Sequence, residues 1–296
     1  MNKLTVFTPT YNRAHLLPRV YESLKNQTSN NFIWMVIDDG SSDGTDELVR
    51  QWQREATFEI QYLYKPNEGM HSAHNVAYAN ITTPFNVCID SDDYMPPNAV
   101  EIICLAACEI ADDDDFCGLI GLDADFNNAL IGTKIPKELQ KVKLNELYQL
   151  HRVKGDKKLV YKTEHIKKIP PYPMFAGEKF VPLDYKYLLL DQNYYLKPLN
   201  EVLVIVEYQD DGSTRNMLRQ YRRHPKGFAF SRISRVDFGI TWKEKAKNAV
   251  HLVSSSLFVN DMSLWLKTKH TALVLCAIPA GVVLNLYIRL KTQKKP

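Results

Sequence analysis

Three carboxylates lie within four residues, at Asp90, Asp92 and Asp93, directly after the apolar run 85–89. We expect the run to be a buried strand, so the chain places this negative charge at a strand end. Carboxylates this close repel one another unless a cation neutralises them. Oxygen ligands suit Mg²⁺ or Mn²⁺, and the pattern therefore favours a divalent cation site. The alternative for this pattern alone is a solvated acidic turn that caps the following helix.

Two further polar clusters follow apolar runs in the same way: TPTYNR at 8–13 and DDGSSDGT at 38–45. Tyr11 offers a ring to stack on a nucleobase, Arg13 a cation for phosphate, and Asp39 an acceptor for a base N–H or a ribose hydroxyl. Turn formation by itself also accounts for the Gly, Ser, Pro and Asn residues of both clusters. Taken singly, neither cluster decides between a ligand site and a turn.

The elements that position these clusters alternate between strands and helices. We expect strands at 3–8, 32–37, 60–64 and 85–89, and helices at 14–26, 46–52, 72–79 and 97–107. Such alternation predicts an α/β fold with a mostly parallel sheet and helices on both faces. Ligands of such sheets bind at the carboxyl ends of the strands, so all three clusters are expected along one edge.

The order of the clusters resembles the family 2 glycosyltransferases, inverting enzymes of the GT-A (Rossmann-like) fold. The matching segments cover about the first hundred residues: TVFTPTYNRAHLLPRVYESLKNQT, FIWMVIDDGSSDGTDELV, NEGMHSAHNVA and VCIDSDDYMPPNAV. The resemblance implies a GT-A catalytic domain over 1–215, with a nucleotide-sugar-binding half at 1–97 and an acceptor-binding half at 98–215. Residues 216–296 are then expected to form a basic, helical, membrane-associating C-terminal region.

The resemblance also implies roles for individual residues of the first two clusters. Those expected to hold the nucleoside are Thr8, Tyr11, Asn12 and Asp39. Among them, Tyr11 is expected to stack on the base and Asp39 to accept a hydrogen bond from it. Arg13 lies where the family approaches the ribose and diphosphate.

Many relatives carry Lys or Arg after the glycine of the EGMH turn, whereas this chain has Met70, followed by His71. The phosphate contact there is therefore either absent or made by His71. In the DSDD element, the resemblance implies that Asp92 or Asp93 ligates Mg²⁺ or Mn²⁺ directly. Asp90 is expected to lie nearer the ribose or the sugar.

Displacement at an anomeric carbon also needs a base on the acceptor hydroxyl. The segment FAGEKF resembles the family segment in which an acid after Gly has this role, so Glu178 is the expected catalytic base and Asp184 the reserve. A structural glutamate is the alternative for Glu178. The segment EYQDDGST resembles another recurring piece of the relatives, and Tyr208 and Asp211 are expected to face the donor there.

These features together predict a metal-dependent inverting glycosyltransferase. The expected donor is a nucleotide-diphosphate sugar, a UDP-sugar, and the expected acceptor is a hydroxyl of a lipid-linked glycan in cell-surface polysaccharide assembly. One alternative is a non-catalytic relative that binds nucleotide or membrane. The other is a nucleotidyltransferase, which should show a Gly-rich basic phosphate loop near the N-terminus. The segment TPTYNRAH is not such a loop.

The composition argues against several other classes of protein. The eight histidines show no HxxxH or HExxH spacing of a zinc site. The basic run 215–235 lacks a recognisable nucleic-acid-reading module, so no nucleic-acid partner is expected. Five cysteines without CxxC spacing are typical of reduced thiols in the cytoplasm, and MNKLTVFTPTYNR lacks the apolar core of a signal peptide.

The C-terminal region suggests a membrane partner. Thr271–Ile288 is an apolar stretch of 18 residues without a charge, about 27 Å long as a helix and short of a hydrocarbon core of about 30 Å. The net charge is only +3, but no acid follows Asp261, whereas six bases do: Lys267, Lys269, Arg289, Lys291, Lys294 and Lys295. We expect a helix or hairpin in the interface, peripheral on the inner face of the plasma membrane. A helix packed on the domain, or a dimer interface, is the alternative.

Overall fold

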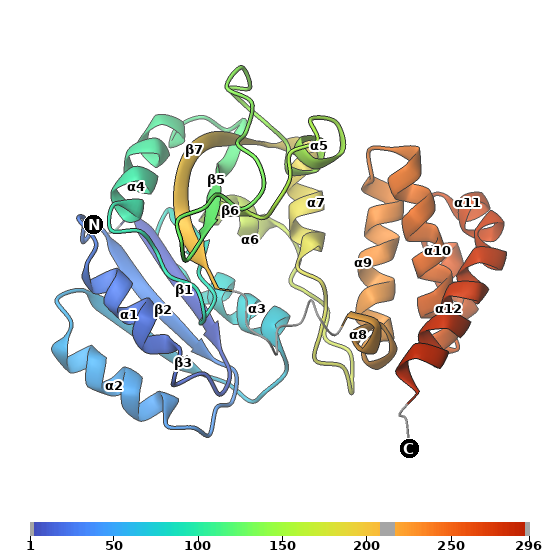
Figure 1. Cartoon of the computed structure of the whole chain (residues 1–296), viewed down its shortest axis with the longest axis horizontal. Coiled ribbons are helices and arrows are strands. Elements are labelled where there is room, and N and C mark those ends of the chain that lie inside the picture. The colour runs from blue at the N-terminus through green and yellow to red at the C-terminus, as the bar shows by residue number, and fades with distance from the viewer. Residues whose placement is uncertain (1–2, 208–216, 294–296) are drawn as a thin grey trace. The chain divides into compact units, whose positions relative to one another are not determined.

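The computed structural model describes residues 3–207 and 217–293, and the chain divides into two compact units (Figure 1). The first unit comprises Met1–Pro170 and Asn193–Gln209, and the second comprises Pro171–Gln192 and Asp210–Pro296. Residues 171–192, expected in the acceptor-binding half, thus group with the C-terminal helices. Tyr208 and Asp211 lie outside the described residues.

A seven-stranded sheet in the order β3-β2-β1-β4-β6-β5-β7 organises the first unit. Its strands are β1 (Leu4–Thr10), β2 (Phe32–Asp38), β3 (Glu59–Tyr64), β4 (Phe85–Cys88), β5 (Phe116–Asp125), β6 (Lys157–Lys162) and β7 (Tyr195–Val206). Strand β6 runs antiparallel to both β4 and β5, and the other neighbouring pairs are parallel. The prediction of a mostly parallel sheet is confirmed.

Helices cover both faces of this sheet. They are α1 (Leu17–Lys25), α2 (Thr45–Glu55), α3 (Met70–Asn80), α4 (Ala99–Ile110) and α6 (Thr163–Lys168), and the same unit also contains the short helix α5 (Leu144–Gln149). Successive residues of a strand point to opposite faces. In β1, Leu4 and Val6 join the core formed with α1, α2 and α4. Phe7 instead meets the rings of His74 and Tyr78 in α3, at centroid distances of 5.1 and 5.6 Å.

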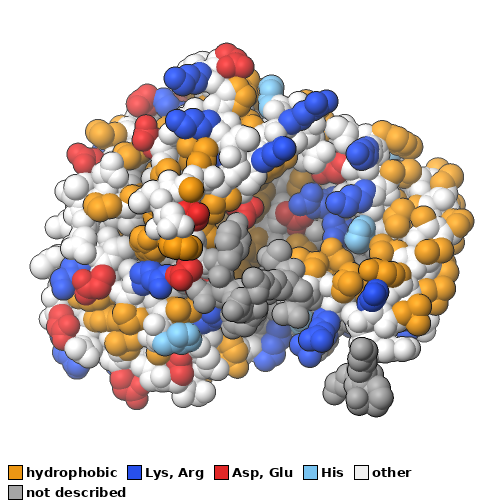
Figure 2. Space-filling model, in the orientation of Figure 1, with side chains coloured by type: hydrophobic (Ala, Val, Ile, Leu, Met, Phe, Trp, Pro, Cys, Tyr) orange, Lys and Arg blue, Asp and Glu red, His pale blue; other side chains and the backbone are white. Residues whose placement is uncertain are grey.

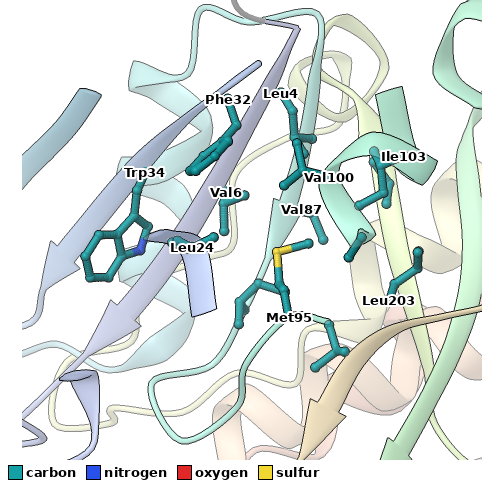
Figure 3. Close-up of a cluster of buried hydrophobic side chains, with 14 of the residues drawn as sticks. Leu4, Val6, Leu24, Phe32, Trp34, Val87, Met95, Val100, Ile103 and Leu203 are labelled. Carbon is teal, nitrogen blue, oxygen red and sulfur yellow. The ribbon is translucent and has the colours of Figure 1, made fainter. Parts of the chain in front are cut away.

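The core on the α1 side of the sheet is rich in aromatic rings. Tyr21 stacks on Trp52, with ring centroids 4.6 Å apart and planes 9° apart, and the Trp34 ring lies 5.7 Å from Trp52. Figure 3 shows Trp34 and Phe32 of β2 beside Val6 of β1. Because both strands bury their side chains in one core, their parallel register is fixed, and with it the position of the loop after each strand.

The second unit is helical, as expected for the C-terminal region. Its helices are α7 (Asp184–Asn193), α8 (Met217–Arg223), α9 (Pro225–Phe238), α10 (Trp242–Val259), the 3₁₀ helix η2 (Met262–Lys267), α11 (Thr271–Cys276) and α12 (Ile278–Thr292). Within the described residues, no helix combines the length and the apolar character needed to cross a membrane.

The apolar stretch Thr271–Ile288 forms two helices, because α12 begins with Pro279 in its first turn. Along one side α12 packs closely on α10, where a Cβ added at Gly281 would collide with Val253. The Asn285 amide donates to the Ser254 carbonyl over 2.9 Å. One side of the stretch is therefore packed on the unit, as the alternative interpretation has it.

Candidate functional site

The loops that follow β1 and β2 are joined by hydrogen bonds through Asn12. Its backbone N–H donates to Ser41 Oγ, and its Oδ1 accepts from the Ser42 N–H, both over 2.9 Å. Asn12 has φ of 52°, in the left-handed region that Asn tolerates better than most residues. The neighbouring Tyr11 side chain is 48% exposed. Asn12 therefore holds the two loops together, and Tyr11 presents an open ring beside them.

Thr8 serves the sheet rather than the loop. Its side chain is fully buried, and its Oγ1 accepts a hydrogen bond of 3.0 Å from the Trp34 indole. This placement differs from the expected nucleoside contact, because a side chain without exposed surface does not contact a ligand. Thr8 is therefore not part of the proposed binding set.

Asp39, at the end of β2, anchors the turn before α3. Its Oδ1 accepts from Lys65 Nζ over 2.7 Å and from the Glu68 N–H over 3.0 Å, and its Oδ2 accepts from the Gly69 N–H over 2.7 Å. A carboxylate oxygen has two lone pairs, so Oδ2 keeps acceptor capacity for a ligand. In the first turn of α3, His71 is buried at 1% exposure, so a phosphate contact would require this turn to rearrange.

The acidic turn after β4 is partly buried. Asp93 is 5% exposed and accepts a hydrogen bond of 3.3 Å from the Glu207 N–H. Burial raises the pKa of Asp93 to about 8, Lys158 opposes this, and the charges of Asp90 and Asp92 add to it. The turn therefore holds more negative charge than its surroundings solvate.

Two residues that the sequence analysis missed belong to the same cluster. Asp123 in β5 is 3% exposed, its Oδ1 has no hydrogen-bond partner among the described residues, and burial raises its pKa. Lys158 in β6 donates to the Cys88 carbonyl over 3.3 Å. Burial lowers the pKa of Lys158, but the charges of Asp123, Asp90 and Asp93 outweigh burial and raise it. Lys158 is thus a cation built into the acidic cluster.

One signal in the sequence pointed to Asp123, because it is an acid near the end of an apolar run, as Asp39 and Asp90 are. No comparable signal existed for Lys158. It lies near the beginning of its strand, and it reaches the carboxyl end of β4 only because β6 runs antiparallel to β4. Strand direction depends on pairing between segments about seventy residues apart.

The acidic cluster has the chemistry of a site for a hard divalent cation. Within residues 3–207 and 217–293, no three His, Cys, Asp or Glu side chains are placed to hold a metal ion. The oxygen donors, the raised pKa of Asp93 and the Asp123 oxygen without a partner nevertheless fit such an ion, because each indicates negative charge in need of a cation.

The expected base lies in the second unit, at the beginning of α9. Glu178 Oε1 accepts from the Lys226 N–H over 3.0 Å, and Oε2 accepts from the Gly227 N–H over 2.9 Å. These are backbone groups that a helix leaves without partners in its first turn. The reserve residue Asp184 accepts from Ser231 Oγ over 3.0 Å and forms an ion pair with Arg235. Glu178 therefore has a structural role, whether or not it also has a catalytic one.

The burial of Asp93 predicts how stability depends on pH in the absence of divalent ions. Below the unfolded pKa near 4, the Asp93 carboxyl is protonated in both the folded and the unfolded protein. As pH rises from about 4 to about 8, the carboxyl ionises in the unfolded protein but stays protonated in the folded one, so the free energy of unfolding falls until pH reaches the folded pKa. In EDTA, Asp93→Asn should therefore gain stability relative to the natural protein between these limits and level off above them. Thermal unfolding from pH 4 to 9 measures this difference. Asp114→Asn, at an exposed acid, is the control, and parallel profiles for all three proteins would contradict the assignment.

Comparison with known proteins relates these features to one family. The model of glycosyl transferase family 2 matches residues 5–168, more than half of the chain. An uncharacterised glycosyltransferase of Rickettsia bellii is 36% identical over 100 residues, which are 34% of this chain and 14% of that protein. A chondroitin synthase of Pasteurella multocida is 33% identical over 99 residues, 33% of this chain and 10% of that protein. The match thus spans only a small part of these relatives.

Solved structures share the fold. S. aureus TarS in complex with UDP-GlcNAc has a TM-score of 0.56 and 18% identity, over 95% of this chain and 80% of that one. The mannosyltransferase PcManGT of Pyrobaculum calidifontis, in complex with GDP-Man and Mn²⁺, has a TM-score of 0.55 and 17% identity, over 99% and 81% of the two chains. These likenesses support the expected GT-A fold.

Proposed function

Because the chain belongs to glycosyl transferase family 2 and is a glycosyltransferase, we propose that it is a metal-dependent inverting enzyme. In this proposal it moves a sugar from a nucleotide-diphosphate donor, a UDP-sugar, to an acceptor hydroxyl. The observation that carries the proposal is the gathering of carboxylates and one lysine at one edge of the sheet, beside the joined loops after β1 and β2.

The loops supply the groups that a nucleotide needs. The open ring of Tyr11 stacks on the base, and the free acceptor capacity of Asp39 Oδ2 receives a base N–H. Asn12 positions Tyr11 by holding its loop, and Arg13 provides a positive charge for the diphosphate. The half-buried Asp90 is proposed to contact the ribose or the sugar.

Asp92 and Asp93 are proposed to hold Mg²⁺ or Mn²⁺. When bound, such an ion supplies positive charge that steadies the departing diphosphate. PcManGT, which shares the fold, was solved with Mn²⁺ and GDP-Man. In this chain Lys158 already offsets part of the negative charge of the cluster, so the carboxylates lie close together in the folded protein before an ion binds.

Glu178 is proposed to take the proton from the acceptor hydroxyl as the oxygen attacks the anomeric carbon. Its two backbone hydrogen bonds fix the carboxylate and leave lone pairs for a proton. Asp184 is the weaker candidate, because its carboxylate is already engaged by the Ser231 hydroxyl and by the ion pair with Arg235.

The acceptor is proposed to be a lipid-linked glycan in the assembly of a cell-surface polysaccharide, with the enzyme cytoplasmic and peripheral on the inner face of the membrane. The support is that a matched relative is named a chondroitin synthase, and that the C-terminal region is basic and apolar.

The test is release of nucleoside diphosphate from a panel of UDP- and GDP-sugars, with Mn²⁺ or with EDTA. We expect turnover of one donor class in Mn²⁺ and its loss in EDTA. Absence of turnover with every donor and acceptor, at concentrations where nucleotide binds, would favour a non-catalytic relative. Release of pyrophosphate instead would indicate a nucleotidyltransferase.

A further inference from the structure

The outward side of α12 is apolar from Val282 to Leu290. Side chains that are 37–69% exposed recur there at helical spacing: Val282, Val283, Leu286, Tyr287 and Leu290. The opposite side, with Gly281, Asn285 and Ile288, is buried against the unit. We call the five exposed residues the α12 stripe. Figure 2 shows hydrophobic side chains gathered over the region of α11 and α12.

An exposed stripe of this kind is unusual for a helix at a protein surface, where polar residues normally face solvent. Contiguous exposed apolar patches on soluble proteins mark sites that bind a protein, a membrane or a ligand. The inner side of α12 already packs on α10, so the stripe is not the side by which α12 joins the described part of this unit. It is available to a partner.

The charges around the stripe decide between partners. Lys291 is exposed on α12, whereas Arg289 donates to Asn285 Oδ1 over 2.7 Å on the packed side, and no acid occurs in the sequence after Asp261. If a second copy of the chain packed stripe against stripe, like charges would meet without an acid on α12 to neutralise them. A bilayer with anionic headgroups presents apolar chains to the stripe and negative charge to the bases that flank it.

We propose that the α12 stripe is a membrane-docking face that lies in the interface of an anionic bilayer, with Lys291 at the headgroups. Neither helix of the apolar stretch crosses the bilayer, since α12 keeps its other side packed on α10. This inference rests on the proposed function only for its biological setting, a lipid-linked acceptor. The docking itself is independent of which sugar is transferred.

Co-sedimentation of the full chain with vesicles tests the proposal. One set of vesicles contains phosphatidylcholine alone, and the other contains about a quarter phosphatidylglycerol. We expect the natural protein to pellet with the anionic vesicles and to be partly released by salt, because charge supplies only part of the attraction. Val283→Glu with Leu286→Glu should weaken binding by at least about tenfold. Lys291→Gln should weaken it less.

The matched control is Leu105→Glu, the same kind of change at a side chain that is 64% exposed on α4 of the other unit. It should pellet like the natural protein. Thermal unfolding confirms that each variant is folded, and donor turnover in solution should be unchanged in all of them. A natural protein that stays in the supernatant, or a stripe variant that pellets undiminished, would overturn the docking face and leave the transferase proposal intact. If the natural protein binds no vesicles but sediments as a dimer, and the stripe substitutions dissociate this dimer, the proposal is also overturned and the partner is a second copy of the chain.

Discussion

Replacing Glu178 by Gln should lower the transfer rate by about a thousandfold, because an amide does not accept a proton from the acceptor hydroxyl. Donor binding should be unchanged, since the residues proposed to hold the nucleotide lie in the first unit. Gln retains one acceptor oxygen for the Lys226 or Gly227 N–H, so the cost in unfolding free energy should be only about 1 kcal/mol. Single-turnover kinetics with saturating donor measures the chemical step directly.

A matched control separates the proposed catalytic role of Glu178 from its role as a cap of α9. Thr241 caps α10 in the same unit by accepting from the Glu244 N–H over 3.1 Å. Thr241→Ala should cost about 1 kcal/mol of stability, as caps do, and leave transfer intact. If Glu178→Gln behaves like Thr241→Ala, with a small loss of stability and full transfer, Glu178 is structural and the base lies elsewhere.

Replacing Asp93 by Asn should lower transfer by about a hundredfold or more, since metal ions contribute several kcal/mol at developing negative charge. The variant should also lose the rise in melting temperature that Mn²⁺ produces in the natural protein. Asn still accepts the hydrogen bond from Glu207, which limits the structural effect. Transfer assays over a range of Mn²⁺, with thermal unfolding beside them, measure both quantities.

The control for the metal prediction is again Asp114→Asn, which should respond to Mn²⁺ like the natural protein. A natural protein whose transfer is unaffected by EDTA would contradict the metal assignment. Lys158 would then be the cation that balances Asp90, Asp93 and Asp123 during the reaction.

The sequence was sufficient to predict the parts of the fold that depend on local pattern. The strands β1, β2 and β4 are apolar runs that end in polar clusters, and their parallel pairing confirms that the clusters share one sheet edge. The helices α1 to α4 lie in the segments predicted to be helical between and after these runs. Each of these inferences needs only neighbours along the chain.

Other features of the fold and the site could not be predicted from the sequence, because they depend on contacts between segments that are distant along the chain. Thr8 begins the polar cluster 8–13, but its hydroxyl is buried against the Trp34 indole, which is 26 residues away. Lys158 enters the acidic cluster only because β6 reverses direction. The apolar C-terminal stretch was recognised, but its division into packed and exposed sides depends on Gly281 meeting Val253. None of these pairings has a signature within one segment.

The most direct test of the central claim is hydrogen–deuterium exchange of the full chain with and without UDP or GDP, in the presence of Mn²⁺. We predict protection in the four segments 8–14, 38–45, 65–72 and 88–95, because one nucleotide would contact all four. Protection confined to other segments, or none when calorimetry shows that the nucleotide is bound, would contradict a nucleotide site at this edge of the sheet.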